Sequence, residues 1–170
     1  MLSQALRIND GVARGLLERL AEHGMITIAE NGAALSPTGQ VRLEKELELL
    51  SVKKIHELDE TDLVPGKHAA GIRLANKYRP GMTGVKERDE AVRAGADGTI
   101  TLAIVRGRLV MPPDNRDTRE ISSQEDERLR KLFRPLEKDL LIIGFADDSR
   151  TALIGALAAT LAISSSSPMK

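Results

Sequence analysis

The sequence contains no cysteine and no tryptophan, and its three aromatic residues are Tyr78, Phe133 and Phe145. The absence of cysteine excludes a disulfide framework, a zinc knuckle, an iron–sulfur cluster and a thiol nucleophile, and it suits a protein of the reducing cytoplasm. So few aromatic rings do not favour a platform on which single-stranded bases stack. Secreted disulfide scaffolds, cysteine-based metal sites and base-stacking domains are therefore not expected.

An excess of charge and a long hydrophobic run are also missing. Lysine and arginine number 25 and aspartate and glutamate number 25, so the strongly basic composition of many nucleic-acid-binding proteins is absent. The two most apolar segments, 140–146 and 152–163, are both shorter than the roughly 20 residues that cross a bilayer. Residues 1–7 lack the apolar core and cleavage site of a signal peptide. We expect a cytoplasmic protein without a membrane partner.

The sequence has 170 residues, of which 41% are hydrophobic, and this suits one ordinary domain or two small ones. Changes in composition divide it into four parts. Residues 1–50 form a first domain, 51–66 form a linker or carry one strand, 67–163 form a second domain, and 164–170 form a disordered tail.

The first fifty residues predict helices around one hairpin. A short helix over 2–7 is followed by turn residues and by a second helix that runs to about His23, with Gly24 as its C-cap. Asn31-Gly32 between two apolar runs predicts a two-residue hairpin turn. A third helix begins in the segment 36–39 and carries an apolar stripe.

The second domain reads as alternating strands and helices. The expected strands are 68–74, 99–105, 108–111 and 140–145, and the expected helices are 85–94, 123–133 and 149–161. The order β-α-β-β-α-β-α is that of a ferredoxin-like α/β sandwich with an additional C-terminal helix. The predicted fold class is therefore α+β.

The segment 14–26, followed by Leu35-Ser36-Pro37-Thr38-Gly39, resembles the recognition helix and wing of MarR- and ArsR-like winged helix-turn-helix regulators. The resemblance covers about 45 residues. In that family the recognition helix enters the major groove of DNA. The resemblance implies DNA contacts by the following residues: Asn9, Asp10, Ala13, Arg14, Arg19 and, at the tip of the wing, Asn31.

Two features of residues 1–50 leave other interpretations open. The family's fold begins with one more helix, so either a truncated start, another segment of the chain or a partner chain covers the exposed face. Five basic and seven acidic residues give this part a charge of −2, whereas DNA affinity rests largely on phosphate neutralisation. Arg14 and Arg19 also fit an ordinary solvated helix surface, with Arg14 and Glu18 as an i,i+4 pair. A winged helix used for protein contact or dimerisation is the alternative.

In the second domain, the glycine-rich segment 81–84 precedes a charged helix, and the N-terminus of that helix is a natural anion site. Two interpretations of Arg88 and Asp89 are open. Either they face a ligand crevice beside this helix, or they lie on an exposed helix that is stabilised by i,i+4 ion pairs.

Further along the chain, Asp147 and Asp148 follow a buried strand, and together with Asp97 they are candidates for binding a ligand or a divalent cation. Capping of the last helix explains Asp148 without a ligand. No catalytic residues, metal ligands or cofactor motifs are indicated.

Segments 91–102, 107–112 and 141–144, combined with the winged helix, resemble an uncharacterised archaeal family of winged-helix proteins with a C-terminal domain of unknown function. We expect a DNA-binding transcriptional regulator whose second domain senses a small-molecule effector or forms a homodimer. The alternative is an enzyme-like module that binds a metal or phosphate ligand through Arg88, Asp89, Asp97, Asp147 and Asp148.

Overall fold

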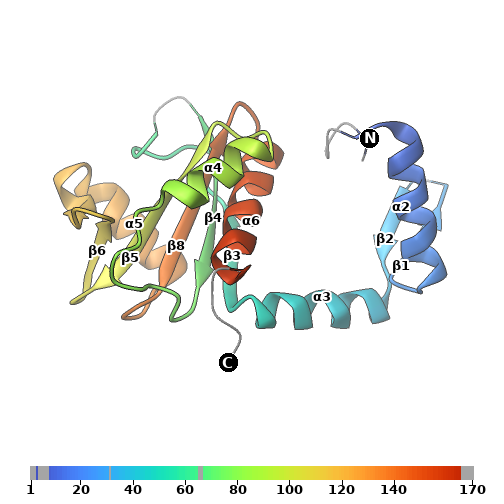
Figure 1. Cartoon of the computed structure of the whole chain (residues 1–170), viewed down its shortest axis with the longest axis horizontal. Helices are drawn as coiled ribbons and strands as arrows, with labels where there is room; N and C mark the ends of the chain where they lie inside the picture. The colour runs from blue at the N-terminus through green and yellow to red at the C-terminus, as the bar shows by residue number, and fades with distance from the viewer. Residues whose placement is uncertain (1–2, 4–7, 31, 65–66, 166–170) are drawn as a thin grey trace. The chain divides into compact units, whose positions relative to one another are not determined.

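The computed structural model describes residues 3, 8–30, 32–64 and 67–165. The chain divides into two compact units, unit 1 (Met1–Leu49) and unit 2 (Leu50–Lys170) (Figure 1). The segment 51–66, predicted as a linker or a strand, begins unit 2, because Val52–Glu57 forms strand β3 of its sheet.

Unit 1 contains helix α2 (Asp10–Glu22), a hairpin of β1 (Ile26–Ala29) and β2 (Gly32–Leu35), and helix α3 (Pro37–Leu49). Asn9 caps α2 by accepting the Val12 N–H at 2.8 Å. Gly39 is buried against the start of the hairpin, where a Cβ atom would lie 1.8 Å from the Met25 carbonyl oxygen. The predicted order of helix, hairpin and helix is therefore present. The predicted helix over 2–7, apart from Ser3, and the turn residue Asn31 lie outside the described residues.

Unit 2 is built on one six-stranded sheet whose paired strands are all antiparallel, with the order β3-β4-β8-β5-β6-β7. Its remaining elements are β4 (His68–Leu74), α4 (Val85–Arg93), β5 (Gly98–Val105), β6 (Arg108–Met111), β7 (Arg116–Asp117), the short 3₁₀ helix η1 (Thr118–Glu120), α5 (Ser123–Phe133), β8 (Leu140–Ala146) and α6 (Ser149–Ser165). Strands β3 and β7 form the two edges. The apolar strand β8 lies near the middle, where both of its faces are covered.

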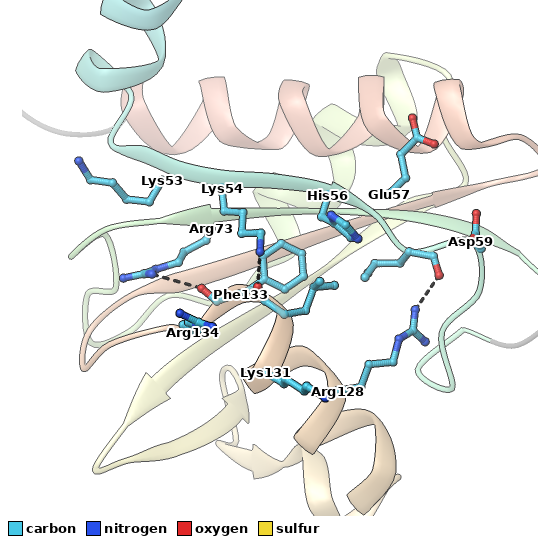
Figure 2. Close-up of a pocket in the computed structure, with 12 residues that line it drawn as sticks. Lys53, Lys54, His56, Glu57, Asp59, Arg73, Arg128, Lys131, Phe133 and Arg134 are labelled. Carbon is cyan, nitrogen blue, oxygen red and sulfur yellow. Dashed lines mark hydrogen bonds between the residues drawn. The ribbon is translucent and has the colours of Figure 1, made fainter.

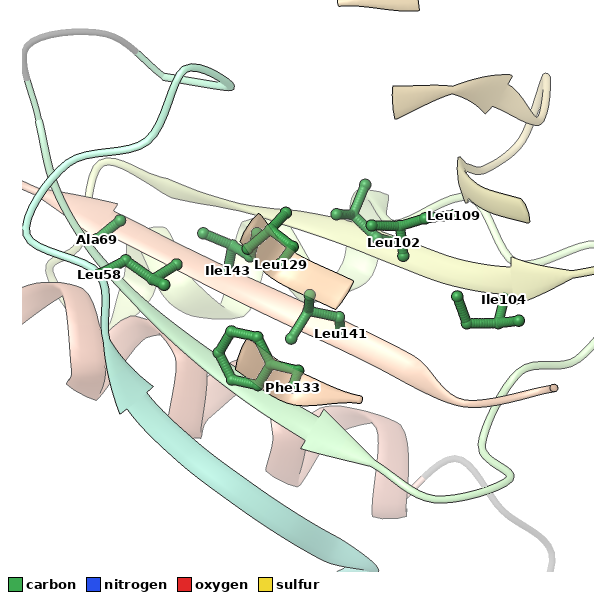
Figure 3. Packing of buried hydrophobic residues seen from close by; sticks show 9 residues of the cluster. All are labelled: Leu58, Ala69, Leu102, Ile104, Leu109, Leu129, Phe133, Leu141 and Ile143. Atoms are coloured by element: carbon green, nitrogen blue, oxygen red, sulfur yellow. The ribbon is translucent and has the colours of Figure 1, made fainter. Parts of the chain in front are cut away.

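Helices cover both faces of this sheet. On one face, Leu129 and Phe133 of α5 pack against Leu141 and Ile143 of β8 (Figure 3). On the other face, α4 and α6 pack together, and alanines from both helices meet alanines of β4 and β8. The α+β class is confirmed. The structure differs from the predicted ferredoxin-like sandwich, which has its helices on one face of the sheet.

Helix α6 lies very close to β8 because small residues face each other. A Cβ atom on Gly144 would lie 2.2 Å from the Ala152 carbonyl oxygen and 2.7 Å from the Ala156 nitrogen. Ala152, Ala156 and Ala159 are fully buried. The helix continues through Ser164 and Ser165, the first two residues of the predicted tail, and 166–170 lie outside the described residues. Within the described part of the chain, none of the helices has the length and apolar content needed to cross a bilayer.

We predict that Gly144→Ala destabilises unit 2 by on the order of 3 kcal/mol, because the added methyl group collides with backbone atoms that cannot rotate away. Urea denaturation followed by circular dichroism measures the change. Gly15→Ala is the control, since among the described residues no atom outside the backbone of α2 itself lies within 4 Å of a Cβ at Gly15. Equal stability of the Gly144 variant and the wild type would contradict the close packing of α6 on β8.

Candidate functional site

A groove of about 760 Å³ lies in unit 2 between the edge strand β3 and the C-terminal end of α5 (Figure 2). We call it the basic groove. It is lined by Lys53, Lys54, His56, Glu57, Leu58, Asp59, Arg73, Arg128, Lys131, Leu132, Phe133 and Arg134. Six cationic side chains and two carboxylates line the groove. Two of the cations, Arg73 and Arg128, are paired with Asp139 at 2.7 Å and Glu125 at 3.0 Å, which leaves a net excess of two positive charges with His56 neutral, so the groove favours an anionic ligand.

Three of the six cations hold the walls of the groove together. The Lys54 ammonium donates to the Leu132 carbonyl at 2.5 Å and so satisfies an acceptor at the end of α5. The Arg128 guanidinium donates to the carbonyls of Leu58 at 2.6 Å and Glu60 at 2.9 Å. These bonds join α5 to the segment that follows β3 (Figure 2).

The third structural cation, Arg73, is paired with the buried carboxylate of Asp139. Arg73 Nε donates to Asp139 Oδ2 at 2.7 Å, and Arg73 Nη1 donates to the Phe133 carbonyl at 3.2 Å. Asp139 also accepts the backbone N–H groups of Asn76 and Leu136, each at 2.9 Å. One buried carboxylate therefore fixes the position of Arg73 and, through it, the end of α5.

The other three cations, Lys53, Lys131 and Arg134, are exposed and form no ion pair with any described residue. They are available to a ligand. His56 packs edge-on against the Phe133 ring, with 6.4 Å between the ring centroids, and this contact gives the groove an apolar floor. The chemistry supported by this arrangement is electrostatic binding of phosphate or carboxylate groups.

This groove is not among the sites expected from the sequence. Two groups of basic residues in the sequence contribute to it. One is the pair Lys53 and Lys54, and the other is made of the basic residues 128, 131 and 134 in and after α5. The two groups lie more than seventy residues apart, and their meeting depends on the position of β3 at the edge of the sheet.

The residues predicted to contact DNA have different environments in unit 1. Asn9, Asp10, Arg14 and Arg19 are exposed, and the Asn9 side chain is engaged as the cap of α2. Ala13 is 6% exposed, so its methyl group faces the interior of unit 1. Asn31 lies outside the described residues.

The five ligand candidates of unit 2 are distributed over three places. Arg88 and Asp89 form an ion pair at 2.9 Å on α4. Lys67 bridges Asp97 at 2.8 Å and Asp147 at 2.5 Å, and hydrogen bonding to Asp147, followed by that to Asp97, raises the pKa of Lys67 above its ordinary value. Asp97 and Asp147 therefore lie on either side of one lysine.

Asp148, the fifth candidate, stands apart as the cap of α6. Its carboxylate accepts the Thr151 N–H at 2.9 Å and the Thr151 hydroxyl at 2.7 Å. These two bonds, led by the one from the hydroxyl, hold the pKa of Asp148 below its ordinary value. Among the described residues, no three histidine or acidic side chains are grouped to hold a metal ion. The structure therefore does not bring the five candidates together in one site.

We predict that Asp148→Ala destabilises unit 2 by about 1 kcal/mol and that Asp148→Asn changes it by only a few tenths, because asparagine also caps helices. The lowered pKa means that the wild-type advantage over the alanine variant is present at neutral pH and is lost as the pH falls through the folded-state pKa. Thermal denaturation between pH 3 and pH 7 measures both effects. A loss as large in the asparagine variant as in the alanine variant would contradict the capping role.

Comparisons with known proteins fit this architecture. The hypothetical protein PH0730 from Pyrococcus horikoshii OT3 is similar in structure, with a TM-score of 0.70 and 24% sequence identity over 93% of this chain and 79% of that chain. This likeness establishes a shared fold. No curated protein matches the chain. The family model described as a domain of unknown function (DUF4443) matches residues 65–163, which include most of the sheet and helices α4, α5 and α6 of unit 2. Since this match covers more than half of the sequence, the chain belongs to the DUF4443 family.

Proposed function

We propose that this chain is a DNA-binding transcriptional regulator in which unit 1 acts as a winged helix-turn-helix, the basic groove binds phosphate groups of the nucleic acid, and unit 2 responds to a small-molecule effector. The observation that carries the proposal is the groove, where Lys53, Lys131 and Arg134 are exposed and form no ion pair with any described residue. Phosphate neutralisation supplies most of the affinity of proteins for DNA, and such an excess of positive charge is what it requires.

The order of elements in unit 1 favours double-stranded DNA over other polyanions. A helix, a two-stranded hairpin and a further helix follow one another, as in the recognition helix and wing of winged helix-turn-helix proteins. The N-terminal residues of a recognition helix reach the bases or the phosphates. Asp10 and Arg14, near the start of α2, are exposed and suit this role, and Arg19 follows them along the helix.

The groove also supplies the positive charge that the first fifty residues lack. Those residues carry five basic and seven acidic side chains, so unit 1 by itself offers little attraction to phosphate. Lys53, Lys131 and Arg134 add three cations that are not neutralised by an ion pair with a described residue. In this proposal unit 1 contributes recognition and the groove contributes affinity.

We predict that the triple variant Lys53→Ala/Lys131→Ala/Arg134→Ala binds DNA about tenfold or more weakly than the wild type and reduces the slope of log affinity against log salt concentration by about three, because three phosphate contacts are lost. Fluorescence anisotropy of the full chain with labelled genomic duplexes, at salt concentrations between 50 and 200 mM, measures both quantities.

The control for charge is the triple variant Arg93→Ala/Arg108→Ala/Arg116→Ala, which removes three exposed cations from α4 and the far edge of the sheet. It is expected to retain most of the affinity. Arg14→Ala tests unit 1 and is expected to weaken binding without affecting the groove. Salt-insensitive binding, or equal losses in the two triple variants, would refute the role of the groove.

A second candidate function, protein contact through unit 1, is favoured by exposed apolar side chains. Val12, Leu16 and Leu20 lie at helical spacing on α2 and are 48%, 39% and 41% exposed. Monomeric proteins seldom leave such a stripe open to water. A homodimer formed through α2 is the partner that this observation supports, and it is compatible with DNA binding by paired half-sites.

We predict that Leu16→Glu/Leu20→Glu shifts the chain from dimer to monomer, because two buried charges oppose association through the α2 stripe. Sedimentation velocity at several protein concentrations measures the molecular mass. The double variant Glu18→Gln/Glu22→Gln on the same helix is the control. A wild-type monomer at all concentrations would rule out this dimer.

A further inference from the structure

A small crevice of about 160 Å³ lies where the start of α4 meets β5 and the end of β6. Thr83, Gly84 and Arg88 line it from the side of α4, and Thr99 and Thr101 line it from β5. None of the residues that line it is acidic. The crevice is smaller than the roughly 300–1,000 Å³ pockets that enclose drug-sized molecules, so its occupant is a small group.

The two threonines of β5 are the first observation that points to a ligand. Thr99 and Thr101 are 8% and 5% exposed, and neither Oγ1 atom has a hydrogen-bond partner among the described residues. Buried hydroxyl groups in folded proteins are nearly always hydrogen-bonded, because burial removes the bonds that water supplies. Two such groups on one face of one strand, lining one crevice, indicate that their partner is an external molecule.

The N-terminus of α4 is the second observation, and it sets the sign of that molecule's charge. The helix has nine residues and begins after Gly84, which has a φ of 75° and no side chain to cap the helix. The N-terminal end of a helix carries partial positive charge and favours anions. A Cβ atom at Gly84 would lie 3.3 Å from Thr101 Cβ, so glycine at this position brings the helix start close to the hydroxyl groups.

Arg88, one turn into the helix, also lines the crevice. Its guanidinium donates to Asp89 from Nε at 3.2 Å and from Nη2 at 2.9 Å, and a guanidinium has further N–H groups that a ligand can use. Hydroxyl groups, a helix N-terminus and a guanidinium are the donors that commonly surround a tetrahedral oxyanion.

We propose that this crevice binds a phosphate group, either as the free ion or as the phosphoryl end of a small phosphomonoester, with Thr99 and Thr101 donating to its oxygens and Arg88 and the start of α4 balancing its charge. The assignment names the chemical class of the effector that unit 2 senses, and only its regulatory meaning rests on the proposed function. Phosphate binding itself is independent of DNA.

The test uses the full chain and measures thermal unfolding and calorimetric titration with inorganic phosphate and with glycerol 3-phosphate, against sodium chloride at equal ionic strength. Phosphate is expected to bind saturably and to raise the unfolding temperature of the wild type. Thr99→Val/Thr101→Val is expected to unfold at the same or a higher temperature without phosphate, because valine removes two unpaired buried hydroxyls, and to lose the phosphate-dependent increase.

Two further variants keep the test decisive. Arg88→Gln, at an exposed position, is expected to fold and to bind phosphate at least about tenfold more weakly. Thr160→Val is the control, since its buried hydroxyl donates to the Ala156 carbonyl at 2.9 Å in α6, and it is expected to keep the phosphate response.

Two results would overturn the site: no response of the wild type to either phosphate compound beyond that to chloride, or a full response in the double valine variant. Tighter binding of glycerol 3-phosphate than of inorganic phosphate identifies the ligand as a phosphomonoester, and the reverse order identifies the free ion. Because no measurement contains DNA, failure of the DNA-binding proposal and failure of this site are separable.

Discussion

The buried Asp139 carboxylate joins two segments that are distant in the sequence, the end of β4 and the loop that follows α5. It accepts from Arg73 on β4, from the Asn76 N–H after β4 and from the Leu136 N–H after α5. Burying a charge is unfavourable unless it is paired and fully hydrogen-bonded. The groups that bond to Asp139 can therefore move little without a large loss of stability. The end of α5 is held against β4 as a result, and the wall that carries Lys131 and Arg134 follows from it.

The sheet of unit 2 separates the two surfaces that we propose bind anions, and they differ in character. The basic groove lies on the side of α5, is wide, and has three exposed cations, Lys53, Lys131 and Arg134, without an ion pair to a described residue. The crevice lies beside α4, is small, and is defined by backbone and by threonine hydroxyls in a rigid strand. Exposed cations suit a long polyanion, whereas fixed donors suit one compact group.

Local chemistry was readable from the sequence. Gly24 follows the end of the helix as expected, and Asp148 caps α6. The hairpin forms, but Gly32 pairs with Ala29 as the first residue of β2 and does not lie in the turn that the sequence predicts. The order of the strands was not readable, because β8 pairs with β4 and β5 across large sequence separations that no spacing reveals. The groove depends on that order. For the crevice, the sequence indicates the glycines before α4, whereas the lack of hydrogen-bond partners at the Thr99 and Thr101 hydroxyls depends on how β5 is covered in the folded chain.

Strand β3 is the edge of the sheet, and after Val52 all of its side chains are exposed. Such a strand offers a row of backbone groups to which another molecule can add a strand, and this is a common route to aggregation. Lys53, Lys54 and Glu57 place charges along this edge, and charged side chains are how many natural sheets discourage such addition. The lysines that contribute positive charge to the groove therefore also discourage copies of the chain from joining edge to edge.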